Sequence, residues 1–261
     1  MGYENLIYEK RGHVGIVTMN RPEHLNAMSS GMEADLKAVF VEMDLDADVR
    51  VTILTANGRG FCSGAYLKDE NKHVVNGPEV VMKPRLQGRS TLETMWDYPK
   101  PLLSAVNGLA YGGGLNYVLC SDLAIACEEA TFCFPMPKIG IIPAVPGVGA
   151  LVLRVGAVKA AEMSLIGEPI TAKEAYEWGL INKVVPKADL MSEALVWAEK
   201  IADCAPMSER MIKEDLQRSI EHHWDASATW LRDMMCFMSE DRAEGHRAWR
   251  NGRTQPNFVG R

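Results

Sequence analysis

The chain has 261 residues, of which 47% are hydrophobic and 24% charged. This balance is typical of a globular protein and excludes a disordered or collagen-like chain, and no apolar run approaches the roughly 18 residues of a membrane span. The net charge of −6 argues against a nucleic-acid-binding protein, because such proteins usually present a basic face.

The cysteines and the first residues bear on the cellular setting. No short C-x-x-C pair occurs, so the spacing of a zinc site is missing and we expect no metal. The first residues lack a basic stretch followed by an apolar one, so we expect no secretory signal. We expect reduced thiols and a cytoplasmic protein. The cysteines are Cys62, Cys120, Cys127, Cys133, Cys204 and Cys236.

Strand and helix patterns alternate through the first part of the chain. Apolar β-branched runs predict strands and apolar residues at helical spacing predict helices, with a turn at Gly12 and a capping box from Ser30 to Glu33. In chain order we expect strands at 6–9 and 13–19, a helix at 30–45, a strand at 49–55, a helix at 85–97, a strand at 102–106, a short helix at 115–121 and strands at 123–127 and 131–134.

The pattern becomes helical after residue 143. We expect helical segments at 159–166, 189–203, 207–222 and 225–250, a second capping box at Thr171 to Glu174, and a last strand at 180–185. The order predicts an α/β core over 1–195 and a helical C-terminal region over 196–261. The apolar and aromatic residues between Trp224 and Met238 predict core packing or a subunit interface.

Two glycine-rich loops follow buried strands, at 58–64 and at 107–114. Glycine lets a ligand approach the bare backbone, and the second loop opens a helix whose first N–H groups are unpaired. Neither loop has the dinucleotide or phosphate-binding fingerprint, and each alone is equally typical of a purely structural turn. One N–H from each loop, converging on one carbonyl oxygen, would form an oxyanion hole.

Ordered motifs along essentially the whole chain resemble those of the crotonase (enoyl-CoA hydratase/isomerase) superfamily. They are Asn20–Pro22 with Leu25–Ala27, Gly60–Ala65, Val106–Gly114 with Ser121–Asp122, Ile139–Pro143, Ala172–Val185 and Ser239–Asp241. The resemblance implies an α/β, crotonase-like spiral of repeated ββα units with a C-terminal helical trimerisation region. It therefore also implies a homo-trimer or a dimer of trimers.

The same resemblance implies an acyl-CoA thioester substrate, so coenzyme A is part of the substrate and no separate cofactor is expected. The thioester oxygen would be held by the N–H groups of Ala65 and Gly113, as in an oxyanion hole that stabilises developing enolate charge. The positions that match the family's CoA-binding ones are Leu25, Ala27, Ala65, Tyr66, Leu67 and Gly113.

Two departures bear on the reaction. Hydratases of this family use two glutamates, and their positions are taken here by Asn116 and Met136. Neither side chain titrates, and general acid–base catalysis contributes about 10²–10⁴-fold, so we expect ordinary hydration to be nearly lost. Tyr66 stands where an aspartate is usual. Dehalogenase-like members also carry tyrosine there, but their aspartate nucleophile would fall at Ala144.

The sequence leaves the acid and base open. Candidate replacements, although residues of these kinds are more often plain surface or wall residues, are Tyr66, His73, Arg89, Glu93, Asp97 and Lys138. We expect an acyl-CoA enzyme that stabilises a thioester enolate. The alternatives are an isomerase, hydrolase or carbon–carbon lyase of the same superfamily, or a non-catalytic homologue that binds CoA thioesters or RNA, although the acidic charge disfavours RNA.

Overall fold

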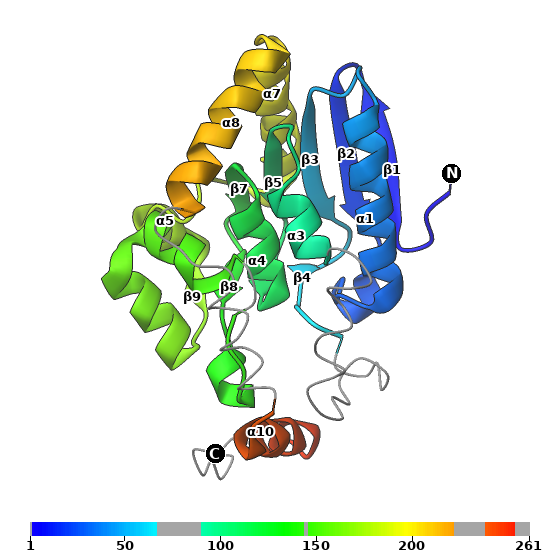
Figure 1. Ribbon diagram of the computed structural model, residues 1–261. Coiled ribbons are helices and arrows are strands. Elements are labelled where there is room, and N and C mark those ends of the chain that lie inside the picture. Colours follow the sequence, from blue (N-terminus) through cyan, green and yellow to red (C-terminus); the bar gives the residue numbers. More distant parts are fainter. Residues whose placement is uncertain (1, 67–89, 144–145, 222–237, 254–261) are drawn as a thin grey trace.

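A computed structural model describes residues 2–66, 90–143, 146–221 and 238–253 (Figure 1). In this part of the chain the strands form a six-stranded sheet, in the order β1-β2-β3-β5-β7-β10, and a four-stranded sheet, in the order β4-β6-β8-β9. The strands are β1 (Leu6–Arg11), β2 (Val14–Met19), β3 (Val51–Ala56), β4 (Gly60–Cys62), β5 (Leu102–Val106), β6 (Leu109–Tyr111), β7 (Leu123–Cys127), β8 (Thr131–Cys133), β9 (Ile170–Thr171) and β10 (Lys183–Val185).

The chain moves repeatedly from the larger sheet to the smaller one. β3 is followed by β4, β5 by β6, and β7 by β8, and in each pair the first strand lies in the six-stranded sheet. The strands β3, β5 and β7 are parallel to one another, as are β4, β6 and β8. Helix α4 follows β6 and completes a ββα unit, so the expected spiral of ββα units is confirmed.

Every residue of β3 and β5 is buried, so both faces of the six-stranded sheet are covered, as is usual for parallel strands between helices. Helix α1 packs against β1 and β2, and α7 packs against β2, β3, β5 and β7. The helices are α1 (Ser30–Leu45), α3 (Thr91–Trp96), α4 (Gly113–Cys120), α5 (Gly147–Ala161), α6 (Ala172–Glu177), α7 (Leu190–Ala202), α8 (Pro206–Glu221) and α10 (Glu240–Arg250), with short helical segments η1 (Pro22–His24), η2 (Met136–Ile139), η3 (Glu162–Ile166) and η4 (Lys187–Asp189).

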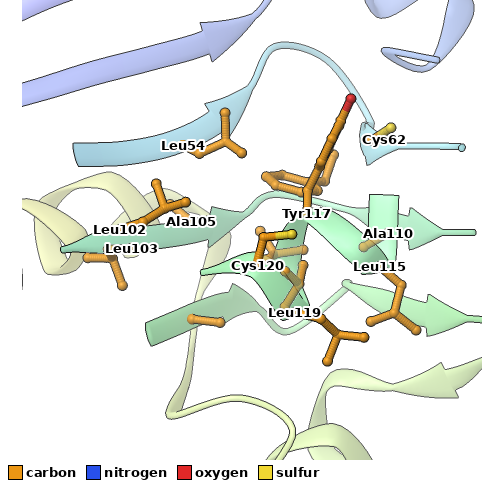
Figure 2. Close-up of a cluster of buried hydrophobic side chains, with 14 of the residues drawn as sticks. Leu54, Cys62, Leu102, Leu103, Ala105, Ala110, Leu115, Tyr117, Leu119 and Cys120 are labelled. Carbon is orange, nitrogen blue, oxygen red and sulfur yellow. The ribbon is translucent and has the colours of Figure 1, made fainter. Parts of the chain in front are cut away.

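Helix α4 lies at the centre of the core. Every residue from Gly114 to Cys120 is buried, which explains the continuous apolar run of this short helix. Tyr117 extends from α4 towards Cys62 of β4, among side chains that include Leu54 of β3 (Figure 2). The helix therefore joins the two sheets, and Gly114 in its first turn lies against the backbone of Cys62.

Most expected elements are confirmed, and the differences have local causes. The helix expected at 30–45 is confirmed as α1, but its N-cap is Ser29 and not Ser30, because the side chain of the extended Ser29 accepts a hydrogen bond from the N–H of Met32. The expected strand at 180–185 is shorter, as β10. The expected helix at 85–97 is α3, which begins at Thr91, while residues 85–89 lie outside the described residues.

The expected helical segment at 159–166 contains a break between two helix types. Residues 159–161 end α5, and the next five residues form η3, a π-helix that ends at Gly167. Within α5, Gly156 has a φ of +74°, so the helix is kinked there. A Gly in the left-handed region interrupts the helix at no steric cost, and the sequence pattern alone gave no sign of this break.

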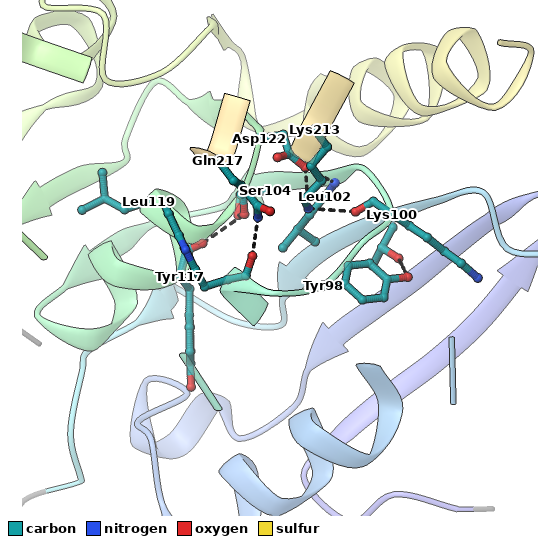
Figure 3. Close-up of polar contacts among 12 residues, drawn as sticks. Tyr98, Lys100, Leu102, Ser104, Tyr117, Leu119, Asp122, Lys213 and Gln217 are labelled. Carbon is teal, nitrogen blue, oxygen red and sulfur yellow. Dashed lines mark hydrogen bonds and ion pairs between the residues drawn. The ribbon is translucent and has the colours of Figure 1, made fainter. Parts of the chain in front are cut away.

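Polar contacts fix the C-terminal helices on the core. The expected boundary between an α/β core and a helical C-terminal region, at residue 195, falls inside α7, which packs on the sheet. The division of the chain at this residue stays a prediction. Lys213 of α8 is buried, pairs with Asp122 at 2.8 Å and donates to the carbonyl of Lys100 at 2.9 Å (Figure 3). Most of the Trp224–Met238 segment lies outside the described residues. Within the ranges that are described, no helix is both long and apolar enough to cross a membrane.

Candidate active site

The two glycine-rich loops meet backbone to backbone. A β-carbon on Gly64 would lie 2.9 Å from the carbonyl oxygen of Tyr111, and one on Gly114 would lie 2.1 Å from the carbonyl oxygen of Cys62. A β-carbon on Gly108 would lie 2.2 Å from the oxygen of Arg59. Real β-carbons do not approach backbone atoms so closely, so these glycines are required for the two loops to touch.

Ala65 presents its N–H away from the neighbouring segment. It forms a parallel bridge with Met28, in which the N–H of Met28 donates to Gly64 at 2.8 Å and the N–H of Tyr66 donates to Met28 at 3.3 Å. Successive N–H groups of an extended segment point in opposite directions, so the N–H of Ala65 points away from Met28. Among the described residues it has no acceptor, and Ala65 is exposed.

Gly113 is the first residue of α4. Gly112, with a φ of +55°, is the N-cap and offers no side chain, so the N–H groups of the first turn have no capping partner. Within the described part of the chain, the N–H of Gly113 has no acceptor either. The positive end of the α4 dipole lies at this N–H, which favours negative charge beside it. Both expected donors therefore lie where the loops touch.

The opposite end of α4 is held by a guanidinium. Arg154 of α5 donates to the carbonyl oxygens of Val118 and Leu119, each at 3.2 Å, and also to that of Ser121. These carbonyls lie in the last turn and at the C-cap of α4, where a helix runs short of its own N–H donors. A positive charge at a helix C-terminus is favourable, so Arg154 fixes the helix whose other end carries Gly113.

Two methionines lie over the glycines of the second loop. The terminal methyl of Met136, in η2, lies 3.5 Å from the position of a β-carbon on Gly112, and the sulfur of Met28 lies 2.0 Å from that of Gly113. Asn116 donates its N–H to Gly112 at 3.1 Å, so it stands one helical turn beyond Gly112. Met136 therefore lies beside Gly112, and Asn116 follows Gly112 by one turn of α4.

Asn26 and Asn107 brace the loops, and the sequence gave neither a role of this kind. Asn26 is fully buried at a φ of +53° and donates to the carbonyls of Asn57 and Gly60, each at 2.9 Å. Asn107 donates to Gly58 at 3.1 Å. Asparagine tolerates a positive φ, and its side chain readily forms hydrogen bonds with nearby backbone groups. The asparagine in Leu25-Asn26 is therefore the one sequence feature that could have indicated this bracing role.

The residues matched to CoA-binding positions lie beside the first loop. The carbonyl of Leu25 accepts from Ser63 at 3.0 Å, and Ala27 is buried. The ring of Tyr66 lies edge-on to His24, with 5.2 Å between ring centroids, and the guanidinium of Arg21 lies 5.4 Å from its centre. Tyr66 therefore faces η1, and Leu67 lies outside the described residues.

Three candidate acid–base residues hold structural positions in the fold. Glu93 forms a capping box with Ser90 at the start of α3. Lys138 is exposed and pairs with Glu168 at 2.5 Å. Asp97 is the C-cap of α3. The candidates His73 and Arg89 lie outside the described residues, as does Ala144, the position of the dehalogenase nucleophile.

Cys62, beside the first loop, is a poor nucleophile. Burial raises the pKa of its thiol to about 12, so the reactive thiolate is scarce at neutral pH. Within the described ranges no group of three or more histidine, cysteine or carboxylate side chains is placed to hold a metal ion. The chemistry available to the described site therefore rests on backbone N–H groups.

Comparisons with known proteins identify the family of the chain. A model of the enoyl-CoA hydratase/isomerase family matches residues 9–261. A probable mitochondrial enoyl-CoA hydratase of Dictyostelium discoideum is 36% identical over 94% of this chain and 88% of its own length. The carnitinyl-CoA hydratase structure from Mycobacterium avium is 33% identical, with a TM-score of 0.86 over 98% of this chain and 99% of that one. A methylmalonyl-CoA decarboxylase structure is 26% identical, with a TM-score of 0.85 over the full length of both chains. The chain belongs to the enoyl-CoA hydratase/isomerase family, within the crotonase superfamily.

Proposed function

We propose that the protein binds an acyl-CoA thioester and stabilises its enolate between the N–H groups of Ala65 and Gly113. The observation that carries this proposal is the contact of the two glycine loops, beside which the N–H groups of Ala65 and Gly113 have no acceptor among the described residues. A thioester oxygen between them would gain negative charge as the enolate forms. Removing one donor from such a site costs about 3–4 kcal/mol of transition-state stabilisation elsewhere.

We further infer that Asn116 and Met136 take the places of the two family glutamates. Asn116 has no proton to give or remove at ordinary pH, and the Met136 thioether is only a weak acceptor. Hydration of a double bond needs a base to activate water and an acid to protonate carbon. The proposal is therefore an enolate-forming enzyme in which ordinary hydration is a minor activity.

The reactions that fit are isomerisation, thioester hydrolysis and carbon–carbon bond cleavage. Cleavage is favoured within this set, because the broken bond itself delivers its electron pair to the thioester and no carbon-bound proton has to be removed. The methylmalonyl-CoA decarboxylase among the similar structures supports this preference. A non-catalytic acyl-CoA-binding protein is the alternative.

The proposal includes a cytoplasmic trimer, or a dimer of trimers. Free cysteines at five positions of the described residues are in keeping with a reducing compartment. The exposed apolar residues of α8, described below as the α8 patch, support a subunit interface. The patch comprises Met207, Met211, Ile212 and Leu216.

Crotonyl-CoA tests the proposed function. We expect saturable binding by calorimetry, a downward shift of the thioester carbonyl infrared band on binding, and hydration far slower than by a family member with both glutamates. The loss of the enoyl ultraviolet absorbance reports hydration. Turnover near a typical enzyme value of about 10 s⁻¹ would contradict the inferred loss of the glutamates. Failure to bind any acyl-CoA would contradict the substrate assignment.

A further inference from the structure

Helix α10 lies at one end of the molecule and packs against η2, backbone to backbone (Figure 1). A β-carbon on Gly245 of α10 would lie 2.7 Å from the carbonyl carbon of Ile139, the last residue of η2. A β-carbon on Gly140 would lie 2.7 Å from the backbone nitrogen and the Cα of Arg242, in the first turn of α10. Real β-carbons do not come so close to backbone atoms, so the contact requires a glycine on each side.

The segment η2 is a single compact turn that connects this contact to the second glycine loop. It spans Met136–Ile139, and the N–H of Gly140 donates back to the carbonyls of Met136 and Pro137. The N–H of Ile141 also donates to the carbonyl of Met136, at 3.2 Å. A turn closed by these bonds moves as a unit, so a displacement at Gly140 is passed on to Met136.

The other end of η2 lies against the second loop. Met136 is buried, and its terminal methyl lies 3.5 Å from the position of a β-carbon on Gly112, the residue that precedes the proposed donor Gly113. The methionine side chain is unbranched and has three rotatable bonds, so it has little fixed shape of its own. The place of this methyl is therefore set by where the backbone of η2 is held.

These contacts form one chain from α10 to the site. We propose that Gly245 is a positioning residue: it lets α10 rest on η2, holds Met136 against Gly112, and thereby limits the length of acyl chain that the site accepts. A side chain at position 245 would push η2 away from α10 and alter the contact of Met136 with Gly112. The limit on acyl length rests on the proposed function, whereas the coupling of Gly245 to Met136 does not.

The positioning step is tested without any ligand. In wild-type protein labelled at the methionine methyls, we expect a nuclear Overhauser effect between the terminal methyl of Met136 and the α-protons of Gly112, because these groups are in contact. The resonance of this methyl is identified by its loss in Met136→Leu. In Gly245→Ala we expect the Overhauser effect to weaken and the methyl resonance to shift. The methyl of the fully buried Met32, in α1, serves as a reference that should not shift.

Two acyl-CoA ligands that differ only in chain length test the consequence. Isothermal titration calorimetry gives the ratio of the affinity for hexanoyl-CoA to the affinity for butyryl-CoA. We expect this ratio to be about fourfold higher in Gly245→Ala than in the wild type, the effect of burying one further methylene group. A loss of folded protein alone would lower the amount of both complexes together and leave the ratio unchanged.

Two further variants of α10 locate the effect. Ala243→Leu adds bulk at an exposed position of the helix, and we expect it to change neither the Overhauser effect nor the affinity ratio. Ala248→Gly removes a buried methyl from the helix face that carries Gly245, one turn further on. We expect it to change both measurements in the same direction as Gly245→Ala, but less. Because it adds no bulk, it still tests the contact if Gly245→Ala does not fold.

The outcomes separate this inference from the proposed function. If the Overhauser effect is unchanged in a folded Gly245→Ala protein, or if Ala243→Leu weakens it equally, Gly245 does not position Met136. If it weakens while the affinity ratio stays the same, Met136 does not limit the acyl chain, and the proposal is overturned. If the wild type binds neither ligand, the proposed function is wrong, whereas the Overhauser effect still decides whether Gly245 positions Met136.

Discussion

Gly64 and Gly113 approach so closely that a β-carbon on Gly64 would lie 3.2 Å from the amide nitrogen of Gly113. Gly64 also has a φ of +90°, a conformation that residues with a side chain rarely adopt. Two separate constraints therefore require glycine at this position. We infer that the same contact brings the N–H of Gly113 near that of Ala65, the residue after Gly64, as the proposed oxyanion hole requires.

Gly113→Pro removes the N–H of Gly113 while keeping a residue that helices accept at their first position. We expect a loss of about 10²–10³ in the rate of the acyl-CoA reaction, because one oxyanion donor is removed. We also expect a smaller shift of the thioester carbonyl band on binding. Steady-state kinetics and difference infrared spectroscopy measure the two effects.

Gly113→Ala is the matched control. It adds a β-carbon against the sulfur of Met28, as proline does, but it keeps the N–H. Asn107→Ala would be a poor control, because the Asn107 amide joins the two loops. If the folded proline and alanine variants are equally impaired, the effect is steric and Gly113 is not a donor.

The thiol of Cys62 makes stability depend on alkaline pH. Burial raises the pKa of this thiol from 9.0 to about 12, so the folded protein holds the proton more tightly than the unfolded chain. The resulting stabilisation is complete below about pH 9 and is lost as the pH rises towards 12, by about 1 kcal/mol per pH unit. Urea unfolding at several pH values measures this slope. Cys62→Ala should have a shallower slope, and an unchanged slope would mean that other groups cause the loss.

Periodicity and glycine spacing were enough to predict the framework around the site. The strand at 102–106 and the capping box at Thr171 were predicted from local residues, and both are confirmed. The two glycine-rich loops were identified as a pair, and the structure brings them into contact. These features depend on neighbours in the sequence, which is why sequence reasoning reached them.

Long-range contacts were out of reach. The short strands β6 and β9 exist because they pair within the four-stranded sheet, and nothing in Leu109–Tyr111 alone predicts a strand. The buried, unpaired amide of Asn116 depends equally on distant packing. Sequence placed Asn116 at the site only through family resemblance, while its lack of a partner is a property of the folded chain.

The α8 patch is the basis of an oligomer prediction. Met207 is 77% exposed and Met211 52%, and single exposed apolar residues are common whereas grouped ones mark interfaces. We expect light scattering at micromolar concentration to give the mass of a trimer or of a dimer of trimers. Met211→Lys should lower that mass, and Leu45→Lys, at an exposed apolar residue of α1, should not. A monomeric wild type would contradict the prediction.

Arg154 links the stability of the fold to the geometry of the site. Its guanidinium donates to three carbonyls at the end of α4 and to the carbonyl of Leu180 at 3.5 Å. Arg50 serves as a comparison, because it donates to a single carbonyl, that of Ala202, at 3.0 Å. Arg154→Met leaves several of these acceptors unpaired. We expect it to lower the free energy of unfolding by about 3 kcal/mol, and Arg50→Met by about 1 kcal/mol, from the usual contribution of such bonds.

Urea denaturation measures both losses, and Arg154→Lys should recover part of the first, because an ammonium still donates to the carbonyls but lacks the planar fork. If α4 also loses its fixed position, the infrared shift of the bound thioester carbonyl should shrink in Arg154→Met and stay unchanged in Arg50→Met. Equal destabilisation by the two methionine variants would mean that the carbonyls of α4 find other partners. Arg154 would then not be the residue that fixes the end of α4 opposite Gly113.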